Sequence, residues 1–182
     1  MSTAPIEIVT PRKHPVPDRV LRTLAKRLAT ALTTSVSVTG PIDVGPAADE
    51  AEVGPQLSSN RIIDHLIARD GARDHPPRRW VVAVTNADLA APERDFVFGE
   101  ATVGGAWAVV STARLQEDDD EDATLDRLMK ETVHELGHIA GLDHCPRPKC
   151  VMHPSTSVLE IDRKQAAFCD RCNSRFPPAS RT

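Results

Sequence analysis

The residues His134-Glu135-Leu136-Gly137-His138 form an H-E-x-x-H motif. On a helix, residues four apart stack one turn above the other, so both imidazoles can reach one metal ion. Glu135 follows the first histidine around the helix, where its carboxylate can stand beside a water molecule on the metal without being a ligand. The motif therefore predicts a zinc site with a neighbouring general base.

A third imidazole follows at His144. A continuous helix would not bring it to the same ion, but Gly141 can adopt a positive φ at little cost and turn the chain back. Three protein nitrogens leave the fourth zinc position for water, which is the arrangement of catalytic zinc. We expect Glu135 to accept a proton from the zinc-bound water as it attacks a peptide carbonyl, and to return it to the leaving amine. Histidines that bind no metal are the alternative.

The cysteines lie together in the C-terminal part of the chain, at Cys145, Cys150, Cys169 and Cys172. In a reducing compartment, clustered thiols are more useful as zinc ligands than as disulfides. Two disulfides in an exported domain are the other interpretation, but the start of the chain has no basic segment followed by an apolar one, as a signal peptide would. The cluster therefore favours a metal site.

These residues need a scaffold, and the pattern of apolar residues predicts one of class α/β (α+β). The run from Trp80 to Val84 is apolar throughout, which is typical of a central strand covered by helices on both faces of a largely parallel sheet. Further strands are expected at 6–9, 35–39, 96–98 and 107–110, with the last two joined as a hairpin and 107–110 near a sheet edge.

Three helices are predicted around this sheet. The first begins at Asp18, the expected N-cap, the second near Ser59, and the third runs from Ala123 to Gly141 and carries the motif. The acidic run 117–122 suits the N-terminus of that third helix, where the macrodipole favours negative charge. A last helix, capped by Asp162 with Gln165, is expected to present Cys169 and Cys172 one turn apart.

Composition excludes several classes of function. The chain has 182 residues, which fits one domain, and its net charge of -4 with a pI near 6.0 gives no basic surface for a nucleic acid. No apolar run is long enough to cross a membrane. We therefore expect a cytoplasmic monomer whose partner is a peptide or protein substrate, with no nucleic acid and no membrane.

The order Cys-x4-Cys-x-Met followed by Cys-x2-Cys resembles the archaemetzincin family of zinc metallopeptidases, in the metzincin clan. Three other stretches resemble the family as well: V-A-V-T-N-A-D-L at 82–89, F-V-F-G-E-A at 96–101 and V-V-S-T-A-R-L at 109–115. The resemblance is close from about Trp80 to Cys172 and weak in the N-terminal half.

The resemblance implies a zincin-like fold with a small C-terminal zinc-bound subdomain, and two zinc ions. In a single domain of residues 1–182, it implies a sheet-and-helix part over about 1–141 and a zinc part over about 142–182. It implies that 109–112 borders the cleft and pairs with an extended substrate, and that the enzyme acts on short peptides like an aminopeptidase. The implied roles are catalytic zinc ligands His134, His138 and His144, base Glu135, Met-turn residue Met152, and structural zinc ligands Cys145, Cys150, Cys169 and Cys172.

Two other functions are compatible with the same residues. A zinc-binding regulatory or peptide-binding module would keep both metals with little or no turnover, although the presence of Glu135 argues against it. A purely structural role for both ions would leave the open zinc position without a purpose. The chain contains no tyrosine, which excludes a phenolic group as an oxyanion donor or as a fifth ligand.

Overall fold

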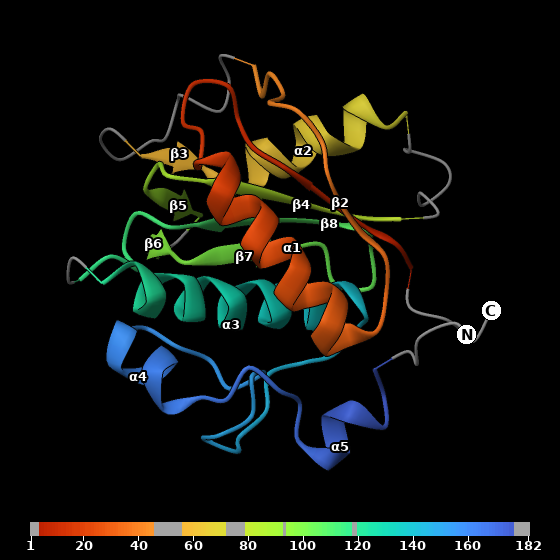
Figure 1. Cartoon of the computed structure of the whole chain (residues 1–182), viewed down its shortest axis with the longest axis vertical. Coiled ribbons are helices and arrows are strands. Elements are labelled where there is room, and N and C mark those ends of the chain that lie inside the picture. The colour runs from red at the N-terminus through yellow and green to blue at the C-terminus, as the bar shows by residue number, and fades with distance from the viewer. Residues whose placement is uncertain (1–3, 46–55, 72–78, 93, 118–119, 177–182) are drawn as a thin grey trace.

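The computed structural model describes residues 4–45, 56–71, 79–92, 94–117 and 120–176. The described residues form a five-stranded sheet in the order β2-β1-β4-β8-β7 (Figure 1). Within it β1, β2, β4 and β8 run parallel, and β7 runs antiparallel to β8. The predicted mixed, mostly parallel sheet is therefore confirmed, with strands β1 (Ile6–Val9), β2 (Val36–Val38), β4 (Trp80–Thr85), β7 (Gly99–Ala101) and β8 (Trp107–Ser111).

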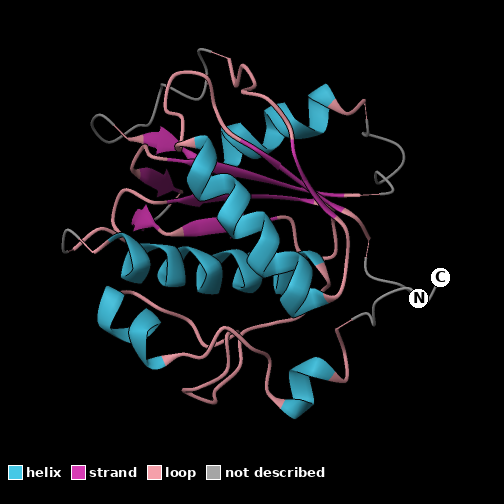
Figure 2. Cartoon of the chain, in the orientation of Figure 1, coloured by secondary structure: helices cyan, strands magenta, loops and turns pink. Residues whose placement is uncertain are grey.

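Helices cover both faces of this sheet, as Figure 2 shows. Helix α2 (Ser59–Arg69) packs on one face, against β7 and β8, while α1 (Asp18–Leu32) and α3 (Glu121–Ile139) lie on the other. Every residue of β4 is buried as a result. This two-sided burial explains the uninterrupted apolar sequence of the strand.

The predicted hairpin exists, but its strands differ from the expectation. Strand β8 is paired on both sides, with Val109 opposite Ala83 of β4 and opposite Glu100 of β7. The edge of the sheet is therefore β7, and the segment 107–110, expected near an edge, lies one strand in from it. The expectation that 109–112 pairs with a substrate is wrong, because the backbone groups of β8 already pair with β4 and β7 inside the sheet.

The segment expected as one strand at 96–98 divides at Phe98 between two sheets. Strand β6 (Arg94–Val97) pairs antiparallel with β5 (Leu89–Ala91), and β5 pairs parallel with β3 (Leu57–Ser58) in a second, three-stranded sheet of the described chain. The chain then continues directly into β7. A single extended segment thus connects the small sheet to the edge of the large one.

Two predicted helix caps are corrected. Asp18 is the first residue of α1, with Pro17 at the cap position, and its carboxylate accepts a hydrogen bond from Arg22 Nε at 2.5 Å. Asp162 lies within α4 (Val158–Arg163) and accepts two hydrogen bonds of 2.8 Å from the guanidinium of Arg127 on α3. The carboxylate of Asp162 therefore forms an ion pair with a distant helix and does not cap a helix of its own segment.

The C-terminal segment lies along α3 on the side away from the sheet (Figure 1). Its elements are α4 and the short α5 (Asp170–Asn173), which begins after Cys169 and includes Cys172. At the other end of α3, Asp120 caps the helix by accepting hydrogen bonds from the backbone N–H groups of Asp122 and Ala123. The acidic run is thus an N-terminal cap, with residues 118–119 outside the described chain. No described helix is long and apolar enough to span a membrane.

Candidate active site

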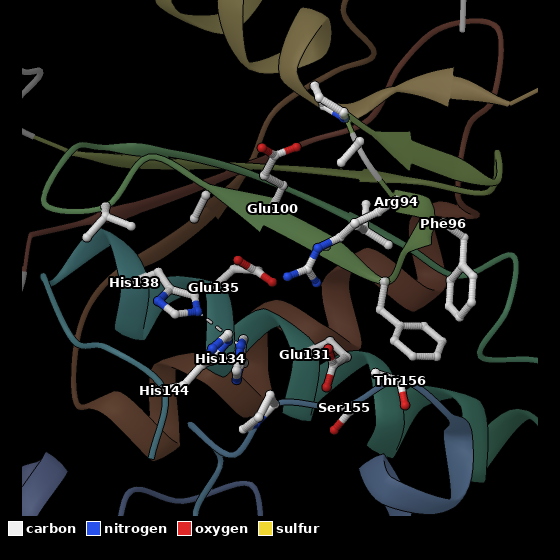
Figure 3. A pocket seen from close by; sticks show the side chains of 18 of the residues that line it. Arg94, Phe96, Glu100, Glu131, His134, Glu135, His138, His144, Ser155 and Thr156 are labelled. Carbon is white, nitrogen blue, oxygen red and sulfur yellow. Dashed lines mark hydrogen bonds between the residues drawn. The ribbon is translucent and has the colours of Figure 1, made fainter. Parts of the chain in front are cut away.

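Helix α3 and the turn that follows it bring the three histidines together. His134 and His138 lie one turn apart on α3, and Gly141, with φ of 82°, reverses the chain so that His144 returns to them (Figure 3). The ring centroids are 4.7, 5.0 and 5.3 Å apart, and one nitrogen of each ring lies within 4.8 Å of the others. The positive φ expected at this glycine is therefore present.

The hydrogen bonds of two of these rings determine which nitrogen carries the proton. His134 Nδ1 lies 2.8 Å from the carbonyl oxygen of Val151, and His138 Nδ1 lies 2.8 Å from that of Leu142. A carbonyl oxygen only accepts, so both Nδ1 atoms donate and, in a neutral ring, Nε2 has a free lone pair. The two Nε2 atoms face each other at 3.1 Å. Two acceptors at that distance fit a shared cation, and imidazole nitrogens are ordinary ligands of zinc.

Electrostatics keep the rings neutral. Burial lowers the pKa of His134 well below its usual value, and it also lowers the pKa values of His138 and His144. Because only a neutral imidazole offers a lone pair, these shifts favour metal binding at neutral pH.

Glu135 is buried between the helix and the edge strand, with only 4% of its surface exposed. A Cβ atom at Gly99 would come within 2.8 Å of Glu135 Oε1 and within 3.0 Å of the carbonyl oxygen of Val109. Glycine at this place in β7 therefore makes room for the carboxylate. Burial raises the pKa of Glu135 well above its usual value, and the charges of Glu131 and Glu100 raise it further. Such a carboxylate is a stronger base than one in water.

A cleft of about 840 Å³ opens over these groups. Residues of β6 and β7 form one wall, and α3 with the segment 154–156 forms the other (Figure 3). Glu135, His134, His138 and His144 all line it. The cleft therefore gives a substrate access to the histidines along the edge of the main sheet.

Met152 is fully buried beside Gly137 of helix α3. Its carbonyl oxygen accepts a hydrogen bond of 2.8 Å from the N–H of Cys145, which ties the methionine loop to the residue after His144. The thioether packs on Gly137, where a Cβ atom would collide with Sδ and come within 3.0 Å of Cε. The glycine inside the motif thus allows the methionine to approach the helix backbone.

Replacing Gly137 with alanine is expected to lower the free energy of unfolding by about 1–3 kcal/mol, because the added methyl group overpacks the contact with Met152. Urea denaturation of the zinc-loaded protein measures the loss. Gly40 is a suitable control, since nothing lies within 4 Å of a Cβ atom built there. A Gly137→Ala variant as stable as Gly40→Ala would contradict the packing argument.

The four cysteines also converge, although they come from two stretches of the chain, 145–150 and 169–172. Their sulfur atoms lie within 4.8 Å of one another, with Cys145 and Cys169 3.8 Å apart, and all four thiols are free. A hydrogen bond from the N–H of Cys172 lowers the pKa of Cys169 to about 6, whereas burial raises the pKa of Cys150 and that of Cys172. Four sulfurs at these distances fit a tetrahedral zinc ion.

An ion pair is buried beside Glu135, and it was not predicted from the sequence. Glu131 lies one turn before Glu135 on α3 and lines the cleft, and its carboxylate accepts a hydrogen bond of 2.8 Å from Lys164 Nζ. Lys164 also donates to the carbonyl oxygen of His153, directly after the methionine. The helical spacing of Glu131 and Glu135 was a usable signal, but nothing in the sequence connects either residue with Lys164.

The sequence is similar to those of known proteins. The model of Peptidase family M54 matches residues 80–177. An archaemetzincin of Halobacterium salinarum is 36% identical over 165 residues, which cover 86% of this chain and 91% of that protein. An archaemetzincin of Methanopyrus kandleri is 45% identical over 122 residues, and the match spans 67% of this chain and 66% of that protein. An archaemetzincin of Archaeoglobus fulgidus is 47% identical over 101 residues, which cover 62% of that protein. The matched part is therefore slightly less than two thirds of the length of these last two relatives.

Solved structures agree with the sequence matches. A crystal structure of the Archaeoglobus fulgidus archaemetzincin in complex with malonate superposes with a TM-score of 0.79 at 35% identity, covering 94% of this chain and 99% of that one. The crystal structure from Methanopyrus kandleri gives a TM-score of 0.78 at 34% identity, covering 94% and 92%. On this evidence of sequence and fold, the chain belongs to peptidase family M54, the archaemetzincin family of zinc metallopeptidases.

Proposed function

We propose that this chain hydrolyses peptide bonds, with zinc held by His134, His138 and His144 and with Glu135 as general base. The observation that carries the proposal is the pair of unprotonated Nε2 atoms facing each other at 3.1 Å at the base of a cleft that Glu135 also lines. Each of the two rings is held in this orientation by a backbone carbonyl behind it. Such support behind a ligand is characteristic of metal sites with a defined function.

The residues of the chain divide the chemistry between them. Bound zinc supplies a Lewis acid that polarises the scissile carbonyl and lowers the pKa of water. Glu135 accepts a proton from the attacking water and transfers it to the amine that leaves. Gly99 leaves the space in which the carboxylate sits, and burial keeps bulk water from weakening it as a base.

Strand β7 replaces the segment 109–112 as the place where an extended substrate pairs. It is the edge strand of the main sheet, and Gly99, Glu100 and Ala101 all line the cleft. No described strand pairs with its outer side, so a peptide can bind there by strand addition. Antiparallel pairing is the more stable geometry, so the substrate runs opposite to β7, with its C-terminal part toward β6.

The experiment that tests the function is cleavage of a mixed peptide library by the zinc-loaded protein. Matched peptides with free and acetylated N-termini separate aminopeptidase-like action from internal cleavage. We expect short peptides with free N-termini to be cut first. If tight peptide binding is measured without any cleavage, the chain is a peptide-binding module and the catalytic proposal is wrong.

A second zinc ion, bound by Cys145, Cys150, Cys169 and Cys172, completes the proposal. It would connect the turn after α3 to α5 and so hold His144 and Met152 in place. Structural zinc contributes to folding directly, because the site does not exist in the unfolded chain.

The Cys169→Ser variant is expected to bind one zinc ion per chain in place of two and to melt at a lower temperature, because it loses a thiolate ligand. Elemental analysis and calorimetry check this. Arg171→Gln, an exposed substitution in α5, serves as the control. Two zinc ions with unchanged melting in Cys169→Ser would show that the cysteines hold no metal.

A further inference from the structure

Arg94 is a basic residue in the wall of the cleft. It is the first residue of β6, and its guanidinium points into the cleft (Figure 3). Its positive charge is close enough to the histidines to lower the pKa of His144, where burial and His138 act more strongly. A substrate that reaches the metal therefore passes within the field of this guanidinium.

Two of the carboxylates that line the cleft with Arg94 already have other partners. Glu131 is paired with Lys164, and Glu100 accepts a hydrogen bond from Ser59. The charge of Asp95 raises the pKa of Arg114, whose main partner is Asp88. Within the described parts of the chain, the guanidinium of Arg94 has no hydrogen bond or ion pair, although it lines a cleft with several carboxylates.

The surroundings of Arg94 suit an anion that arrives with a substrate. Phe96 and Phe98 follow it at alternate positions and contact each other edge to face, with centroids 5.3 Å apart, in the same wall. The guanidinium of Arg114 covers the Phe96 ring at 4.1 Å and so holds the wall in place. Arg94 itself is exposed, so a carboxylate that enters the cleft can reach the guanidinium from solvent.

We propose that Arg94 binds a carboxylate on the C-terminal side of the scissile bond, either the free C-terminus of a short peptide or an acidic side chain. The direction follows from β7, since a substrate antiparallel to β7 extends its C-terminal part toward β6. The planar guanidinium can donate two parallel hydrogen bonds to a carboxylate. The proposal rests on the peptidase function and assigns the substrate class of the same cleft.

Two pairs of peptides with identical cleavage sites test this assignment. In the first pair, one peptide has a free C-terminus and the other an amidated one. In the second pair, both peptides have an amidated C-terminus, and they differ only in having Glu or Gln after the scissile bond. We expect the carboxylate member of at least one pair to have a kcat/KM higher by about five- to tenfold, through KM. In Arg94→Gln this ratio should fall to about one, and in Arg94→Glu below one. Arg163→Gln, an exposed arginine outside the cleft, should keep the ratio.

The same comparison by binding does not depend on turnover. Isothermal titration of zinc-loaded Glu135→Ala with the four peptides, with and without Arg94→Gln, measures the affinity of each carboxylate directly. A carboxylate preference that survives Arg94→Gln would mean that the metal alone binds the anion, and the assignment would be wrong. No preference in the parent protein would also overturn it, while cleavage of neutral peptides would leave the peptidase function intact. Loss of all cleavage with a retained Arg94-dependent preference would instead refute the peptidase function alone.

Discussion

Replacing Glu135 with glutamine is expected to lower kcat/KM for peptide hydrolysis by about 10²–10⁴-fold, the contribution of a general base. The amide has nearly the shape of the carboxylate and fits the same space beside Gly99, so the fold and the histidine cluster should be preserved. Zinc content should not change, because the proposed zinc ligands are the three histidines and Glu135 is not one of them. Cleavage of a fluorogenic peptide, together with elemental analysis, measures both quantities.

A substitution on the same helix provides the control for this prediction. Glu121 lies at the exposed start of α3, where it pairs with Arg19 on the surface. Surface ion pairs contribute little to stability, so Glu121→Gln should keep its activity. Activity that survives Glu135→Gln would remove this carboxylate from the mechanism, whatever the metal content.

Replacing Lys164 with methionine is expected to lower the free energy of unfolding by about 3–5 kcal/mol, because a buried carboxylate then loses its partner. The side chain of Lys164 has no exposed surface and that of Glu131 has 5%. Lys164→Met also removes the donor to the carbonyl of His153, so the loop that carries Met152 loses a tether. Urea denaturation at saturating zinc measures the loss, and peptide cleavage should fall with it.

The double variant Glu131→Leu with Lys164→Met separates the pair from other contacts. Removing both charges leaves no unpaired charge, so most of the lost stability should return, apart from the contribution of the hydrogen bond to the His153 carbonyl. If the effects of the two single substitutions simply add in the double variant, the residues do not act as a pair and the interpretation is wrong.

The effect of Lys164→Met should also depend on pH. Burial already raises the pKa of Glu131, and the charge of Lys164 opposes that shift. Without Lys164 the pKa rises further above its value in the unfolded chain, so the folded state binds a proton more tightly than the unfolded state does. The stability of the variant is then greatest below the unfolded pKa and falls as the pH rises through the folded pKa. Unfolding curves from acid to neutral pH should show the gap from the parent protein widening.

Much of the site followed from local spacing. The placement of His134 and His138 depends on the period of one helix, and the return of His144 depends on the backbone freedom of Gly141. The clustering of the cysteines indicated a shared metal before any folding was considered. Such features are readable from the sequence because they need only residues close together in the chain.

The main sheet was predictable in type but not in strand order. Burial on both faces gives β4 a distinctive apolar run, and β8 has a shorter run at 106–110, whereas the three residues of β7 have no pattern that marks them as the edge strand. Which strand lies at the edge depends on how the chain divides at Phe98. Strand β6, before it, pairs with β5 in the small sheet, and β7, after it, pairs with β8 in the main sheet. Strand pairing is set by the packing of the whole chain, so the place where a substrate can pair was misassigned.

The sequence by itself determined the kinds of chemistry in this protein: three imidazoles, one carboxylate and four thiols at spacings that suit zinc. Tertiary structure alone decided how that chemistry is supported and reached. Glu131 meets Lys164 across 33 positions, Gly99 makes room for Glu135, and Arg94 points into the cleft from a strand of another sheet. The physical reason is that helical periodicity and glycine turns act between near neighbours, while close packing and buried charge pairs join segments whose sequences carry no record of each other.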